Sequence, residues 1–129
     1  MNPPSEDIKD ILIGSSGLGY TFGTDLFIGE EPDGAVDDII TISDTGGWSP
    51  DPHIVYDRPT IQILVRNTSY LDGYSAAEDI SNLMRDQFNV TINSTRYIGS
   101  WMEGAINHIG YDSNKRVLFS MNFNLHRTA

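Results

Sequence analysis

The residues best suited to chemistry in this chain are the tripeptide Asp44-Thr45-Gly46, which follows the apolar residues Ile40 and Ile42. An Asp-Thr-Gly segment that meets its own copy across a dimer would bring two carboxylates together, and the pair would share one proton. Such a pair activates water for the hydrolysis of peptide bonds, as in the dimeric aspartic proteases. The chain of 129 residues has a suitable length for half of such an enzyme.

The surroundings of this tripeptide favour a plain turn instead. Ser43 precedes the aspartate at a position where those proteases carry an apolar residue, and Gly47-Trp48-Ser49-Pro50 follows where another strand should begin. The amphipathic helix expected over Ser75–Phe88 is also larger than that compact β fold holds. Because an aspartate in a turn commonly accepts hydrogen bonds from nearby backbone amides, we expect a turn here, and the aspartic protease remains only the enzymatic alternative.

The other candidates for chemistry lack the spacing that their chemistry requires. His53, His108 and His126 share no ligand-like spacing with one another or with a carboxylate, and we expect His126 to be solvated. The glycines from Gly14 to Gly23 follow a helix, and no Gly-Lys-Ser/Thr comes after them, as a phosphate loop would require. The chain has no cysteine, which excludes disulfides and thiolate sites. We therefore expect no catalytic residue, no metal and no cofactor.

The charge of the chain limits its partners. The net charge of −10, from 18 acidic and 8 basic residues, argues against a surface that grips DNA through its phosphates. The same charge would let a duplex slide past without adhering, or it serves only to keep a small protein soluble. No apolar run could span a bilayer, and the N-terminus lacks the basic start of a signal peptide, so we expect synthesis in the cytoplasm and no membrane partner.

Capping and periodicity predict one short and one long helix. Ser5 is expected to cap a short helix that turns Ile8 and Leu12 toward the core. The long helix covers Ser75–Phe88 and has an apolar stripe along one face. Its first residue stands three positions before Glu78, as a capping box requires.

Apolar residues in runs or in alternation predict strands both before and after the long helix in the sequence. The expected strands are Leu26–Ile28, Ile39–Ile42, Thr60–Arg66, Val90–Ile92, Arg96–Met102, Ala105–Tyr111 and a last one over residues 117–126. This order predicts a single α+β domain over residues 1–129, in which an antiparallel or mixed sheet carries one long and one short helix.

A long loop arm over residues 44–59 supplies the candidate interface residues, because a loop of that length in a small domain is usually functional. Trp48 and Tyr56 lie in it, and Trp48 either folds back onto its own domain or anchors a partner. Arg58 could bind a carboxylate of the next subunit or form a salt bridge within its own. Tyr74 either packs at the start of the long helix or joins the interface.

Three segments together resemble small neck proteins of long-tailed phages, namely the tail terminators and the related minor capsid proteins. The first is Ile42–Gly47, followed by a loop that contains prolines. The second is Arg58–Arg66, followed by Tyr70 and by Gly73-Tyr74 at the entry to the long helix. The third is Asn114–Leu125. The resemblance runs over nearly the whole chain.

This resemblance implies a lambda-like tail-terminator fold and a structural virion protein without catalytic residues. Such proteins form homohexameric rings that cap the finished tail tube. One face of the ring meets the tail tube protein, the other meets the head-side connector or stopper protein, and DNA passes through the lumen without specific binding. A head-completion or stopper protein of the neck is the alternative within the virion.

Overall fold

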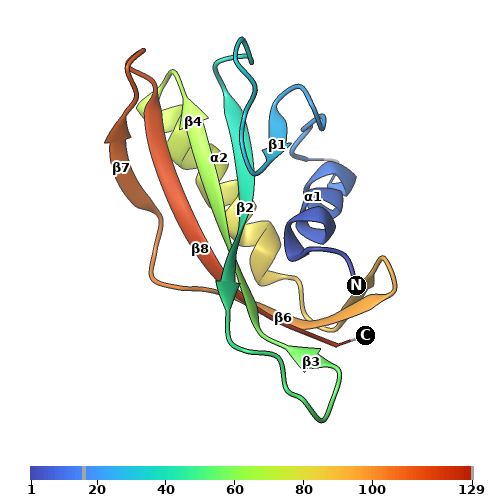
Figure 1. Cartoon of the computed structure of the whole chain (residues 1–129). Helices are drawn as coiled ribbons and strands as arrows, with labels where there is room; N and C mark the ends of the chain where they lie inside the picture. Colours follow the sequence, from blue (N-terminus) through green and yellow to red (C-terminus); the bar gives the residue numbers. More distant parts are fainter. Residues whose placement is uncertain (16, 129) are drawn as a thin grey trace.

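Among the residues that the structure describes, eight strands form one mixed sheet, and two helices lie against it (Figure 1). The structure is a computed structural model that describes residues 1–15 and 17–128. The elements are α1 (Pro4–Gly14), β1 (Leu26–Ile28), β2 (Ile39–Gly47), β3 (Tyr56–Asp57), β4 (Pro59–Asn67), α2 (Tyr70–Arg85), β5 (Val90–Ile92), β6 (Thr95–Met102), β7 (Asn107–Tyr111) and β8 (Val117–Thr128). The strand order is β1-β2-β4-β8-β6-β5, and β3 and β7 also pair with β8. The expected α+β class is therefore confirmed.

Strand β8 is the centre of the sheet. It pairs with β4 and β3 along one side, and with β7 and then β6 along the other. Its residues Phe119, Met121 and Phe123 are fully buried, whereas the residues between them face the opposite side, as strand geometry dictates. The alternation predicted from the sequence thus places the last strand correctly in the core.

Both helices cover the same face of the sheet. Ile8 and Leu12 of α1 share one hydrophobic core with Ala77, Ile80 and Met84 of α2. Helix α1 contacts β1, β2 and β4, while α2 contacts β4, β6 and β8. Within the described residues, no helix has the length and apolarity to cross a membrane. In the described part of the chain, the other face of the sheet carries no helix.

Helix α1 begins one residue earlier than its expected cap. It starts at Pro4, and Pro3 is the N-cap residue, without a side-chain hydrogen bond. Proline suits the first helical position because its missing N–H would be unbonded there in any case. Ser5 therefore lies inside the first turn, and its expected role as N-cap is wrong.

Helix α2 begins five residues earlier than expected, at Tyr70. Its N-cap is Ser69, whose hydroxyl accepts a hydrogen bond from the backbone N–H of Asp72 at 3.4 Å. The capping box expected at Ser75 and Glu78 is therefore wrong. The sequence offers a serine with an acidic residue three positions later at both places, and the tertiary fold selects the first.

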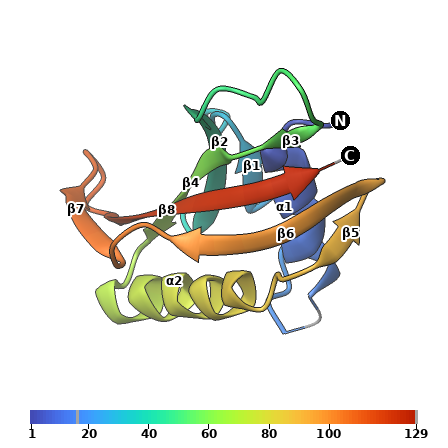
Figure 2. The same cartoon turned by 90° about the horizontal axis from the view of Figure 1, so that it is seen from below.

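The irregular stretch is shorter than the expected arm over residues 44–59. Strand β2 continues through Gly47 and pairs with β4 across a bulge between Asp44 and Gly46. Gly46 and Gly47 have φ angles of 93° and 116°, which favour glycine and let the strand bend without ending. The segment between β2 and β3, residues 48–55, is called the arm below. It projects from the side of the sheet opposite α2 (Figure 2).

A buried polar cluster fastens α1 to the C-terminal end of β8. The Tyr97 hydroxyl donates a hydrogen bond to the Asp7 carboxylate, which also accepts one from the Asn93 side chain at 2.8 Å. Arg127 Nε donates to Asp57 Oδ1 of β3 at 3.0 Å, and Arg127 Nη1 lies 3.4 Å from the Tyr97 oxygen. Burial and the Asp7 carboxylate raise the pKa of Tyr97, so its proton stays in place. These contacts hold β3, the strand that follows the arm, in place against β8 and α1.

Candidate functional site

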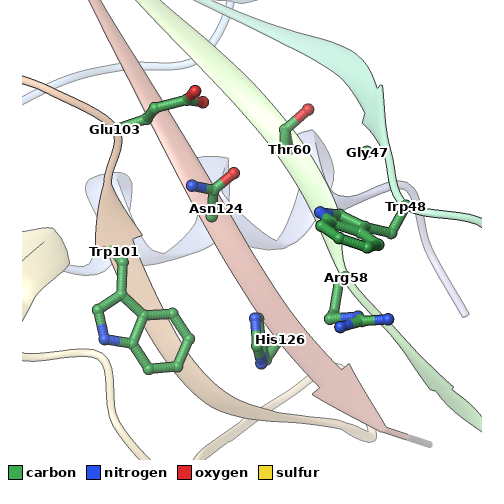
Figure 3. A pocket seen from close by; sticks show the side chains of 8 residues that line it. All are labelled: Gly47, Trp48, Arg58, Thr60, Trp101, Glu103, Asn124 and His126. Atoms are coloured by element: carbon green, nitrogen blue, oxygen red, sulfur yellow. The ribbon is translucent and has the colours of Figure 1, made fainter.

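An open hollow of about 800 Å³ lies on the sheet face that the helices leave uncovered. Its walls come from the end of β2, the start of the arm, β4, β6 and β8 (Figure 3). The lining residues are Gly47, Trp48, Arg58, Thr60, Trp101, Glu103, Asn124 and His126. Two tryptophans, one cation and a polar floor in one hollow are typical of surfaces that bind another polypeptide.

One wall of the hollow is the pair formed by Trp48 and Arg58. The Arg58 guanidinium carbon lies 4.6 Å from the centroid of the Trp48 ring, and the backbone N–H of Trp48 donates to the backbone carbonyl oxygen of Arg58 at 3.1 Å. Trp48 nevertheless keeps 68% of its surface exposed. Among the described residues, no carboxylate forms an ion pair with Arg58. The cation therefore stays available to a partner.

The facing wall is a row of aromatic rings built around His126. The His126 ring lies edge-on to Trp101 at 4.6 Å and to Tyr56 at 5.8 Å, and Phe88 extends the row with a ring 5.7 Å from Trp101. The Tyr56 hydroxyl is 2.6 Å from His126 Nδ1. Burial, followed by the positive charge of Arg58, lowers the pKa of His126, which favours the neutral ring. His126 is half-buried in this row and only partly solvated.

The register of β6 and β8 explains how these rings meet. Gly99 of β6 lies opposite His126, and Trp101 lies opposite Asn124. A Cβ atom on residue 99 would lie 2.6 Å from the Trp101 ring. The glycine therefore leaves room for the indole to pack against His126. The outward positions of the neighbouring strands β6 and β8 therefore bring Trp101 and His126 of this row together.

The structure brings three of the four predicted interface residues together. Trp48, Tyr56 and Arg58 all lie at the arm end of the sheet, around the hollow. Tyr74 lies apart from them, on α2, where its ring packs edge-on against Phe119 at 5.8 Å. Trp101 and His126 are not among the predicted interface residues, although both occupy outward positions of predicted strands.

The tripeptide Asp44-Thr45-Gly46 has a structural role in the fold. The Asp44 carboxylate accepts hydrogen bonds from the backbone N–H of Ser5 at 3.0 Å and from its hydroxyl at 2.7 Å. The Thr45 and Thr60 hydroxyls are 2.7 Å apart across the strands. The tripeptide lies in the bulged end of β2, so the turn expected here is wrong. In the described part of the chain, no group of three or more His, Asp or Glu residues could hold a metal ion.

Known proteins share both the sequence pattern and the fold. The model of a family described as bacteriophage tail terminator protein matches residues 12–129. A chain from the virion of a native gene transfer agent particle has a similar structure, with a TM-score of 0.76 and 11% sequence identity, and the alignment covers 98% of this chain and 96% of that chain. No curated protein matches the sequence significantly. Because the family match covers most of its length, the chain belongs to the bacteriophage tail terminator protein family and is a structural protein of the phage virion.

Proposed function

We propose that this protein joins copies of itself into a ring, a homohexamer, that caps the finished tail tube and stops its growth. One face of the ring binds the tail tube protein, and the other offers a joining surface to the head-side connector or stopper protein. The observation that carries this proposal is the match of residues 12–129 to the tail terminator family.

The uncovered sheet face supports a function in assembly. The hollow between Trp48 and Trp101 combines aromatic rings with the cation of Arg58, which has no carboxylate partner in the described part of the chain. Such residues are enriched where protein partners bury surface. Binding energy here would come from the burial of apolar surface and from charge pairing. Binding of this kind involves no chemical reaction.

The distribution of charge supports a lumen that DNA passes without adhering. The chain carries a net charge of −10. Four of its basic side chains already contact carboxylates, and these are Lys9, Arg66, Arg116 and Arg127. A ring of such subunits would offer few free cations to phosphates, and so few condensed counterions would be released on contact with DNA.

Tube assembly in solution tests the proposal. Tail tube protein that polymerises without a terminator should give tubes of widely spread length in electron micrographs. Addition of this protein should shorten the tubes and leave an extra ring at one end of each. The variant Trp48→Ala should cap less efficiently, whereas Phe22→Ala, which changes an exposed aromatic residue outside the hollow, should cap normally. Tubes that keep their length distribution and carry no ring would contradict the proposal.

A further inference from the structure

We propose, on the basis of the ring proposed above, that neighbouring subunits join head to tail, with the arm of one copy docked on a patch formed by α2 and β7 of the next. The arm patch comprises Trp48, Ile54 and Val55. The α2–β7 patch comprises Tyr70, Leu71, Tyr74, Ile109 and Tyr111. All eight side chains are large, apolar or aromatic, and exposed.

The arm patch presents apolar surface that its own domain does not cover. Trp48, Ile54 and Val55 have 68%, 59% and 61% of their surface exposed. The Val55 carbonyl oxygen accepts a hydrogen bond from the Thr128 hydroxyl at the end of β8, and Tyr56 pairs with the same residue. The arm is therefore tied at its base while its apolar side chains point to solvent. Exposed apolar groups that gather in this way mark a contact with another molecule.

The α2–β7 patch is held together by aromatic contacts. The Tyr70 ring lies 5.2 Å from the His108 ring, and His108 lies 5.4 Å from Tyr111. Leu71, beside Tyr70 on the first turn of α2, is 78% exposed. Strand β7 pairs only with β8 among the described strands, so its outer edge is unpaired and open to a partner.

The two patches lie at opposite ends of the molecule (Figure 1). Tyr111 pairs with Val117, the first residue of β8, and Tyr56 pairs with Thr128, the last described residue of that strand. A strand of this length spans roughly 36 Å. A two-fold dimer in which like ends meet would leave one of the two patches of each subunit exposed. They suit a head-to-tail contact, which closes into a ring when the rotation between subunits allows it.

Three side chains at the two ends carry charges that complement each other, namely Arg58 at the arm end and Asp72 and Glu78 on α2. The arm end carries Arg58, whose guanidinium has no carboxylate partner in the described residues. The exposed side of α2 carries Asp72 and Glu78, which form no ion pair within the same part of the chain. An arginine that meets these carboxylates across the contact would orient the two subunits and oppose pairing of like ends. This complementarity identifies a second copy of the chain as the occupant.

Chemical cross-linking tests the inference cleanly, because the natural chain contains no cysteine. The variants Ile54→Cys and Leu71→Cys each place one thiol in one patch, and one of them carries a size tag. The mixture and each variant alone are treated with a short flexible bismaleimide and separated by mass. The variant Phe22→Cys, an exposed position outside both patches, serves as the matched control, and the molar mass of every sample before cross-linking reports its assembly.

The inference predicts tagged-to-untagged dimers in the mixture of Ile54→Cys and Leu71→Cys, at a yield several-fold above that of either variant alone or of any mixture with Phe22→Cys. Self-linking of Ile54→Cys alone or Leu71→Cys alone would mean that like ends meet and would overturn the inference. Closed oligomers that give no mixed dimer would overturn it as well, while the proposed ring would stand. Monomers at every concentration would overturn both.

Discussion

The carboxylate of Asp44 accepts hydrogen bonds from the backbone N–H and the hydroxyl of Ser5, a residue 39 positions earlier in the chain. The first N–H groups of a helix have no partner inside the helix, and a carboxylate stabilises that positive end. Asp44 therefore caps α1 from the bulged end of β2, shortly before the arm begins. The residue most suggestive of catalysis holds the N-terminal helix against the base of the arm.

Loss of this cap should destabilise the monomer. Asp44→Ala leaves the Ser5 N–H without its partner, and the free energy of unfolding should fall by about 1–2 kcal/mol. The control Asp33→Ala changes another exposed aspartate, which lies in a turn, and should change stability by less than about 0.5 kcal/mol. Denaturant unfolding measures both. Equal stability of the two variants would remove the capping role, and peptide cleavage that depends on Asp44 would restore the protease hypothesis.

The glycine pair at the end of β2 should differ sharply in its tolerance of a side chain. A Cβ on Gly47 would collide with the Arg58 carbonyl oxygen and approach Pro59 Cα at 2.7 Å, whereas a Cβ on Gly46 would meet nothing within 4 Å. Both have positive φ, so Gly46→Ala should cost about 1 kcal/mol through backbone strain alone.

Gly47→Ala should cost more than Gly46→Ala, because the backbone of β4 must also move away. It should in addition displace Trp48 from its stack on Arg58. Unfolding midpoints compare the two variants, and tryptophan fluorescence reports the stack. An equal loss of stability in both variants would mean that β2 and β4 do not approach each other closely at Gly47.

Two tyrosines should make the fold sensitive to alkaline pH. Burial, together with Asp25, raises the pKa of Tyr20 to about 12, and burial raises the pKa of Tyr97. An unfolded tyrosine ionises near pH 10. The stabilisation from both protonated hydroxyls is therefore fully present below about pH 10 and is lost as the pH rises toward 12 and beyond. Stability measured against pH should fall in this window, and Tyr20→Phe should make the fall shallower.

A charge exchange should test the electrostatic part of the subunit contact. Arg58→Glu replaces the free cation of the arm end with a carboxylate. This carboxylate would repel the carboxylates of the next copy, so the concentration needed for assembly should rise at least several-fold. Asp72→Lys added to the same chain should restore much of the loss. The concentration at half-assembly, measured by light scattering, checks both. The single variant Asp72→Lys is measured as well. If the losses of assembly free energy in the two single variants simply add in the double variant, Arg58 and Asp72 do not contact each other across the subunit interface.

The sequence predicts the elements of this fold better than their ends. The alternation from Val117 onward and the apolar stripe of the long helix depend only on local period, and both elements form as expected. The start of α2 differs because Ser69 and Ser75 offer equivalent caps, and the chain beyond them decides between the two. The arm is shorter than expected because Gly46 and Gly47 let β2 continue through a bulge.

The residues of the candidate surface could be predicted only where they lie close together in the sequence. Trp48, Tyr56 and Arg58 fall within one segment, and the structure gathers them at one end of the sheet. His126 joins them through strand register over 70 positions, and Trp101 joins through its pairing opposite Asn124. No local pattern encodes such distant pairings, and the same holds for the contact between Asp44 and Ser5.

The molar mass of the purified protein, followed by light scattering over a series of concentrations, tests the central claim most directly. Assembly into the proposed homohexamer predicts a rise from the monomer to a single plateau at six subunits, with no further growth. A monomer at every concentration would contradict the claim that this protein works through its surfaces. A mass that grows without a plateau would contradict the closed ring.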